Sequence, residues 1–385
     1  MAVADVIVIG GGITGCATAY ELSKRGVQVT LLEREHIHAM GSGWTLAGVR
    51  QSGRHSAELP LAREAIRRWE TLGEELDADV DYRQRGNLRL ALDEQEVATI
   101  RRVVEQGNAA GVEMVYLDST AAREIAPVIT DSVAGASFCP TDGHADNLKT
   151  VQAYAHAAQR HGAAIITGVE VLHLATLGDR VTGVVTTDGT YNADVVIVAA
   201  GVYSPQLLAP LGLPLPIEIV HCPVAQTIPT DSFRLDPVLG VASGGFAARQ
   251  TAGSGIRFIG ASIPWSEGHH TTGNVGMTVQ QMNGMVRNAL AILPGLGALR
   301  IERTWGGLID STPDVIPVLD AVTSHPGLVV GAGFSGHGFG IGPISGEILA
   351  NLATIGSDDR FDLSPFRLDR FAHDSIARTQ LEMLG

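Results

Sequence analysis

The sequence predicts an α/β protein in which two domains are interleaved along the chain. Its 385 residues exceed what one hydrophobic core usually serves. Three apolar runs that end in glycine, typical of buried parallel strands, lie near the start, middle and end, at residues 5–10, 193–201 and 327–333. Because β-rich segments separate them, we expect the domains to interleave rather than to follow one another along the chain.

The first 33 residues predict a strand, a glycine turn, a helix and a second strand. The apolar run at 5–9 favours a buried strand, residues 14–25 favour a helix, and residues 28–33 favour the next strand. The turn between strand and helix reads GGGITG, which has the G-x-G-x-x-G spacing. In this context the spacing indicates a Rossmann-like site for a dinucleotide.

Each glycine of this turn has a physical role. Gly10 permits the tight turn, Gly12 lets a pyrophosphate approach the backbone, and Gly15 lets helix and strand pack closely. The phosphates would then lie on the helix N-terminus, where free N–H groups offset their charge. Glu33, at the end of the second strand, is placed to accept hydrogen bonds from an adenosine ribose. NAD and FAD share this ADP half, so the unit does not distinguish them.

The rest of the chain alternates helical and β patterns. We expect helices near 57–76, 94–110, 147–161 and 276–293. We expect strands or strand–turn segments at 87–92, 133–143, 163–175, 180–191 and 193–201, and a β-rich stretch at 215–265.

A glycine-rich loop near the C-terminus favours a flavin. Residues 331–343 read GAGFSGHGFGIGP and precede a helix that we expect at 343–353. Such a loop lets the backbone pass close to a planar ring, and the helix N-terminus then faces any negative charge that develops there. A flavin gains negative charge at its N1 and C2 carbonyl edge on reduction. A nicotinamide enzyme would leave this loop without a role.

Four motifs in order carry a resemblance to a known family. They are VIVIGGGITGCATAYELSKRGVQVTLLER, VVIVAAGVYSP, WGGLIDSTPDVIPVLD and GLVVGAGFSGHGFGIGPISGEILANL. Together they resemble the FAD-dependent D-amino-acid oxidase, glycine oxidase and sarcosine oxidase superfamily. Within it, GSGWTLAGVRQSGRHSAELPLA at 41–62 is most similar to the β-type subunits of bacterial opine, sarcosine and hydroxyproline dehydrogenases.

The resemblance implies a Rossmann-like FAD-binding domain of the glutathione-reductase type and an interleaved α+β substrate domain on a mixed sheet. The first would comprise residues 1–80, 144–215 and 315–385, and the second 81–143 and 216–314. The implied FAD contacts are Gly10, Gly12, Ile13, Thr14, Gly15, Glu33, Arg34, Ser42, Gly43, Ala47, Gly48, Val49, Val171, Ala200, Gly201, Gly333, Phe334, Gly336, His337, Gly338, Phe339, Gly340 and Ile341.

Departures from the family pattern predict a non-covalent FAD. Gly307 stands where monomeric sarcosine oxidases carry a flavin-linking cysteine, and Thr45 where dimethylglycine dehydrogenase-like proteins carry a linking histidine. Asn147 stands about where heteromeric sarcosine oxidase carries a covalent FMN histidine, so a second linked flavin is not expected either.

The usual anchors for a substrate carboxylate are also absent. Glycine and D-amino-acid oxidases hold the carboxylate with the arginine of a G-L-R-P sequence. The equivalent stretch here is Gly307-Leu308-Ile309-Asp310, which has no arginine, and Gly340 stands where monomeric sarcosine oxidase has a lysine. Arg50 and Arg54 are the nearest cations in sequence. We expect Arg50 to contact substrate or flavin edge, with a structural ion pair as the alternative.

His337 and His55 are candidate acid–base groups, because the reference pKa of histidine lies near neutrality. For His337 the alternative is a hydrogen bond to the flavin edge. Lysine is scarce, with only Lys24 and Lys149, and Phe258 stands where the monomeric oxidase has an oxygen-activating lysine. We therefore favour a dehydrogenase over an oxidase.

The expected reaction is hydride transfer to FAD from the carbon next to the nitrogen of an amino acid or a secondary or N-substituted amine. Water would hydrolyse the imine that forms. The electron acceptor would be oxygen, a quinone or a partner subunit, and the resemblance makes a heteromer with partner subunits possible. Alternatives are a flavin-dependent 2-hydroxy acid or polyol-phosphate dehydrogenase, and a non-catalytic flavoprotein subunit.

Composition limits the partners and the compartment. A net charge of −14 without a basic block repels nucleic acid and anionic membranes. No apolar stretch approaches ~18 residues, so we expect no membrane span. A strand from residue 5 leaves no room for a targeting peptide. Cys16, Cys139 and Cys222 lack metal-like spacing, so we expect no metal site, buried thiols and a cytoplasmic protein.

Overall fold

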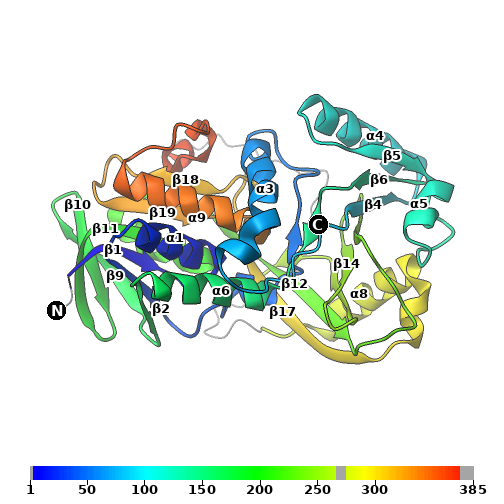
Figure 1. The fold of residues 1–385 in the computed structure, drawn as a ribbon, viewed down its shortest axis with the longest axis horizontal. Coiled ribbons are helices and arrows are strands. Elements are labelled where there is room, and N and C mark those ends of the chain that lie inside the picture. Colours follow the sequence, from blue (N-terminus) through cyan, green and yellow to red (C-terminus); the bar gives the residue numbers. More distant parts are fainter. Residues whose placement is uncertain (1–2, 266–274, 373–385) are drawn as a thin grey trace.

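The computed structural model describes residues 3–265 and 275–372, and these form two sheets with helices around each (Figure 1). The first sheet has strand order β18-β19-β11-β1-β2-β8, and a hairpin of β9 and β10 extends it from β11. Pairing is parallel from β19 to β8. The bounds are β1 Val3–Ile9, β2 Val29–Glu33, β8 Ala164–Thr167, β9 Val171–Leu177, β10 Arg180–Thr186, β11 Gly189–Val198, β18 Val318–Ala321 and β19 Leu328–Ala332.

Both faces of the first sheet are apolar, as a central parallel strand requires. In β1, Val6 and Val8 pack on one face and Ile7 and Ile9 on the other. Helices cover the first face, and the β9–β10 hairpin contributes to the second. The helices are α1 Ile13–Lys24, α3 Leu59–Glu75, α6 Asn147–Arg160 and α9 Gly338–Thr354. Figure 1 shows α1, α6 and α9 beside this sheet and α3 near the junction with the second sheet.

The second sheet is mixed, with strand order β16-β12-β15-β14-β13-β4-β6-β5 and β17 paired with β12. Only the β13–β4 pairing within it is parallel among the described residues. The bounds are β4 Asn87–Ala91, β5 Val115–Asp118, β6 Gly135–Cys139, β12 Glu218–Thr227, β13 Val238–Val241, β14 Phe246–Gln250, β15 Ile256–Gly260, β16 Ile263–Pro264 and β17 Ile301–Ser311.

Smaller elements complete the fold. The helices are α2 Gly41–Trp44, α4 Glu94–Ala109, α5 Ser119–Ile125, α7 Ser204–Leu208 and α8 Val279–Ile292. Strands β3 Gly48–Val49 and β7 Gly143–His144 pair with each other. Short 3-10 helices span Gly201–Tyr203, Ala209–Leu211, Pro294–Ala298, Ser364–Phe366 and Leu368–Phe371. None of the described helices has the length and apolar character needed to cross a membrane.

The predicted fold class is confirmed, and most predicted elements form within a few residues of the expected bounds. The predicted start of the last helix was wrong: α9 begins at Gly338 and contains Pro343. We expected a start at the proline because proline favours a first helical turn. Tertiary contacts outweigh that preference, since the Trp69 indole donates to the Gly340 carbonyl at 2.7 Å and α9 packs along α1. The short helix α5, capped by Asp118, was not predicted.

Candidate active site

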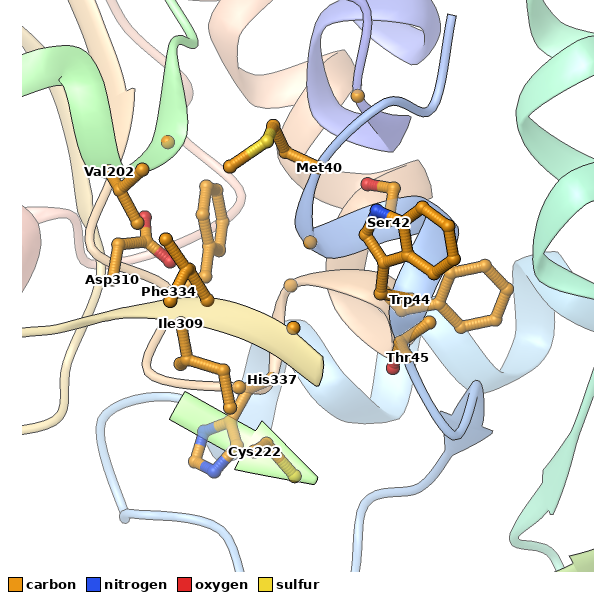
Figure 2. Close-up of a pocket in the computed structure, with 18 of the residues that line it drawn as sticks. Met40, Ser42, Trp44, Thr45, Val202, Cys222, Ile309, Asp310, Phe334 and His337 are labelled. Carbon is orange, nitrogen blue, oxygen red and sulfur yellow. The ribbon is translucent and has the colours of Figure 1, made fainter. Parts of the chain in front are cut away.

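A cavity of about 800 Å³ is lined by residues of both sheets. The first sheet contributes the C-terminal ends of β1 and β2, the residues that follow β11 and the loop that precedes α9. The second contributes residues of β4, β12, β13, β15 and β17. In Figure 2 side chains from the α2 segment (Ser42, Trp44, Thr45) lie across the cavity from Ile309, Asp310 and Phe334. Three stretches far apart in sequence therefore share one cavity.

The GGGITG turn opens into this cavity with an uncapped helix N-terminus. Gly10 has φ +110°, and a Cβ there would collide with the Ala199 carbonyl. Gly15 does not line the cavity; a Cβ on it would collide with the Gly10 carbonyl, so it serves close packing of helix on turn. Gly12 is the N-cap of α1 and supplies no side-chain cap, although Ser42 Oγ accepts from Ile13 N at 3.0 Å. Backbone donors are thus available for phosphates.

The acidic residue at the end of β2 lies beside the same turn. Glu33 Oε2 accepts from Gly11 N at 2.6 Å, and Oε1 accepts from Glu35 N at 2.8 Å. Arg34 stacks on the Tyr203 ring at 4.1 Å. Glu33, Arg34, Tyr203 and Val171 all line the cavity. This end therefore offers a carboxylate and a flat cation–aromatic surface of the kind that an adenosine needs.

The opposite end of the cavity is formed by the loop before α9. The half-buried Asp310 carboxylate accepts from Gly333 N at 2.7 Å, and the Asp310 carbonyl accepts from Ser335 N at 2.9 Å. Burial raises the pKa of Asp310 to about 6. The N-cap of α9 is His337, whose side chain gives no cap hydrogen bond to the helix. A second uncapped helix N-terminus, at Gly338 and Phe339, therefore faces the cavity and fits a ring that becomes negative on reduction.

Buried charges form one wall of the cavity. Arg50, Arg54 and Arg89 line it, and the carboxylates of Glu58 and Asp142 interact with them. Asp142 accepts from Gln51 N at 2.8 Å and from the Ser52 hydroxyl. Arg50 Nη1 donates to the Ser52 carbonyl at 2.8 Å, whereas Arg54 Nη1 is buried with no hydrogen-bond partner among the described residues. Three guanidinium groups against two carboxylates leave one net positive charge.

His337 and Glu58 form a buried pair at this wall. Their Nδ1 and Oε2 atoms lie 3.0 Å apart, and His337 lines the cavity. Burial, together with the nearby Arg54, lowers the pKa of His337 to about 4. Burial opposes ionisation of Glu58, but His337 and Arg54 outweigh it and hold the pKa of that carboxyl at about 2. The pair is therefore a carboxylate beside a neutral imidazole at neutral pH.

Several residues expected at the site do not line the cavity. His55 is half-buried, its Nδ1 accepts from Ala57 N, and its carbonyl accepts from Glu58 N at the start of α3. The others are Gly15, Gly43, Ala47, Val49, Gly333, Gly340 and Ile341, which lie behind the lining. The remaining expected residues line it, namely Gly10, Gly12, Ile13, Thr14, Glu33, Arg34, Ser42, Gly48, Arg50, Val171, Ala200, Gly201, Phe334, Gly336, His337, Gly338 and Phe339.

Sequence reasoning missed Glu58 and Arg89. One available signal was the alternation in β4, where Leu88 and Leu90 enter the apolar core while Asn87 and Arg89 line the cavity. A buried arginine on the polar face of a strand is uncommon without a partner or a ligand. Glu58 had no such signal, because its partner His337 lies 279 residues away.

The lysines and cysteines do not offer the chemistry used elsewhere in the superfamily. Lys24 Nζ pairs with Glu75 at 2.9 Å, and Lys149 Nζ pairs with Asp79 at 2.6 Å. Phe258 packs in the core of the second sheet. The three cysteines are buried and free, and burial raises the pKa of Cys222, at the cavity, to about 11. Its thiol is thus protonated at neutral pH, which fits a non-covalent cofactor.

Within residues 3–265 and 275–372, no three His, Cys, Asp or Glu side chains are grouped as metal ligands.

Comparison with known proteins gives matches along almost the whole chain. Residues 5–352 match the DAO family, described as FAD dependent oxidoreductase. The chain is 31% identical to sarcosine oxidase subunit beta of Arthrobacter sp, covering 95% of this chain and 91% of the relative. It is 28% identical to glycine oxidase of Geobacillus kaustophilus, with 95% and 97% coverage. The crystal structure of L-proline dehydrogenase from P. horikoshii gives a TM-score of 0.88 at 30% identity, covering 96% and 98%.

Proposed function

The chain belongs to the DAO family of FAD-dependent oxidoreductases, and we propose that it oxidises the C–N bond of a secondary or N-substituted amino acid as a dehydrogenase. When bound, FAD accepts a hydride from the carbon next to the substrate nitrogen. The imine that leaves is hydrolysed to a carbonyl compound and an amine or ammonia. Relatives named sarcosine oxidase and L-proline dehydrogenase take their names from secondary amino acids, and one named glycine oxidase takes its name from a primary amino acid.

The cavity residues fit the cofactor at both ends. We assign the pyrophosphate to the N-terminus of α1 and the adenosine to the surface beside Glu33 and Arg34. The N-terminus of α9 would face the pyrimidine edge of the ring and stabilise negative charge there. The observation that carries the proposal is this placement of two uncapped helix N-termini on one cavity.

The charged wall is proposed to hold the substrate carboxylate. Arg54 Nη1 is buried without a hydrogen-bond partner among the described residues, so Arg54 is the first candidate anchor, and Arg89 lies close to it at the same wall. A substrate carboxylate would neutralise the one net positive charge of the wall. Simple amines, which lack that carboxylate, would leave the charge unbalanced and bind weakly.

Two observations favour a dehydrogenase. Both lysines lie outside the cavity lining in ion pairs, and Phe258 occupies the core. Arg257, next to it in sequence, donates to Asn147 at 2.9 Å and to the Thr45 carbonyl at 3.1 Å. No lysine of the described residues is therefore placed to activate oxygen. A partner subunit is a suitable acceptor, since several relatives are named as beta subunits.

Anaerobic reduction of the bound flavin tests the proposal. The purified yellow protein is mixed with secondary amino acids, primary amino acids, uncharged amines, 2-hydroxy acids and a polyol phosphate, and bleaching of the flavin absorbance is followed. We expect bleaching by secondary amino acids, and faster turnover with an artificial dye than with oxygen. Bleaching by hydroxy acids or a polyol phosphate alone would contradict the proposal. A flavin that neither any donor nor sulfite can bleach would indicate a non-catalytic subunit.

A further inference from the structure

The buried pair of Glu58 and His337 has a geometry that the carboxylate anchor does not explain. Glu58 is the residue before α3 and is fully buried, while His337 is the residue before α9 and has 5% of its surface exposed. A carboxylate buried in a protein costs free energy unless its partner repays it. The pair therefore fixes an imidazole at the cavity wall, between the first turns of two helices.

The hydrogen bond determines which nitrogen of His337 carries the proton. A carboxylate only accepts, so a neutral imidazole beside it carries its proton on Nδ1 and donates that proton to Glu58. The lone pair is then on Nε2. No hydrogen bond to Nε2 occurs among the described residues, and the ring lines the cavity. His337 thus presents a hydrogen-bond acceptor to whatever occupies the cavity.

We propose that Glu58 is a positioning residue that holds His337 as the acceptor for the N–H of the substrate amine. This inference rests on the proposed function. Nε2 would receive the N–H hydrogen bond while Arg54 and Arg89 receive the carboxylate, so the two contacts together orient the C–H bond that breaks. Different protein groups therefore bind the amine and the carboxylate of the substrate, so a substitution can remove one contact and leave the other.

The charges around the pair favour the anionic form of an amino acid. The groups that face it are Arg50 and Arg54 from the loop before α3, with Arg89 of β4 and Asp142 close to those arginines. With His337 neutral, the wall keeps one net positive charge. A neutral amine with a carboxylate matches that charge, and the neutral amine is the form that can release hydride. Below the pKa of the substrate amine, the fraction of substrate with a neutral amine rises about tenfold for each unit by which the pH increases. The apparent affinity of the enzyme for the substrate should therefore rise by the same factor.

Glu58→Gln and His337→Asn test the role in the FAD-loaded enzyme. Glutamine can donate to Nδ1 and move the ring proton to Nε2, whereas asparagine keeps a group near Glu58 but loses Nε2. The probes are sarcosine with its analogue methylthioacetate and L-proline with tetrahydro-2-furoate, because each analogue keeps the carboxylate but has no N–H. Binding is read from the perturbed flavin spectrum, and the limiting reduction rate from anaerobic stopped flow at pH 6–10.

We expect both variants to weaken binding of the amino acid at least tenfold, to slow flavin reduction and to flatten its pH profile. The dissociation constant of the N–H-free analogue should change less than threefold. Glu64→Gln, an exposed control on α3, should change nothing. Equal weakening of amino acid and analogue, or unchanged binding of both, would overturn the role of the pair. Wild-type flavin that no amino acid reduces would instead overturn the proposed function.

Discussion

At the scale of single residues, Arg89 decides whether the wall can hold a carboxylate. Its side chain is 3% exposed, and burial lowers its pKa to about 10, so it stays charged at neutral pH. We expect Arg89→Gln to weaken binding of a carboxylate substrate roughly 10- to 100-fold, because a charge-assisted hydrogen bond is worth about 1.5–3 kcal/mol. The dissociation constant of sarcosine or proline is measured by anaerobic titration of the flavin with each amino acid.

Arg85→Gln is the matched control, because Arg85 is exposed and lies outside this cavity lining. FAD content should be equal in the two variants and the wild type. If Arg89→Gln weakens an uncharged amine as much as the amino acid, the effect is structural and Arg89 is not the anchor.

Asp310 should impose a pH dependence on the stability of the FAD-free protein. Its pKa is raised from 3.8 to about 6 in the fold, so the folded state binds the proton more tightly than the unfolded state. Stability therefore falls as the pH rises from about 4 to 6, by roughly 3 kcal/mol in total, and the loss is complete above pH 6. Asp310→Asn removes this contribution.

Urea unfolding of both FAD-free proteins between pH 4 and pH 7 measures the difference. The variant should gain stability relative to the wild type as the pH rises, while its amide oxygen still accepts from Gly333 N. Parallel pH profiles would show that Asp310 ionises in the fold at its ordinary pKa.

At the scale of elements, α9 and α1 approach so closely that only glycine fits at position 346. A Cβ on Gly346 would lie 2.8 Å from the backbone of Ala17 and Thr18, which cannot turn aside. We expect Gly346→Ala to destabilise the protein by about 1–3 kcal/mol, despite the better helix propensity of alanine. Gly284→Ala in α8 meets open space and should stabilise it by up to about 1 kcal/mol. Urea denaturation measures the free energy of unfolding of both variants. Equal changes in that free energy for Gly346→Ala and Gly284→Ala would contradict the packing argument.

Element type was predictable wherever periodicity and local chemistry agree. The β1–α1–β2 unit formed within two residues of its expected bounds, because buried apolar runs and the glycine turn act locally. The start of α9 was not predictable in this way, since it depends on contacts with Trp69 and α1 that are distant in sequence. The same distinction holds for the residues of the cavity. The glycine motifs predicted the backbone donors, because those motifs act locally. Glu58 and Arg89 were not predicted, because the fold brings their partners close from distant parts of the sequence.

At the scale of the whole molecule, one cavity joins the two sheets. Its lining draws on β1, β2 and the segment after β11 in the first sheet and on β4, β12 and β17 of the second. The wall charges also come from both, since Arg89 lies on β4 and Arg54 in the loop before α3. FAD in this cavity would contact segments that fold separately along the chain, so the cofactor should couple the stabilities of both parts.

Removal and return of FAD test this coupling. A ligand that binds only the folded state at about 1,000 times its dissociation constant stabilises that state by about 4 kcal/mol. In a chain of this size each kcal/mol raises Tm by roughly 1.2 °C, so we expect FAD to raise the Tm of the FAD-free protein by about 5 °C. Calorimetry should show one transition that moves as a whole. ADP reaches only the α1 end of the cavity and should give a smaller shift. An equal shift with ADP, or a second transition that FAD leaves unmoved, would mean that the second sheet does not contribute to holding the cofactor.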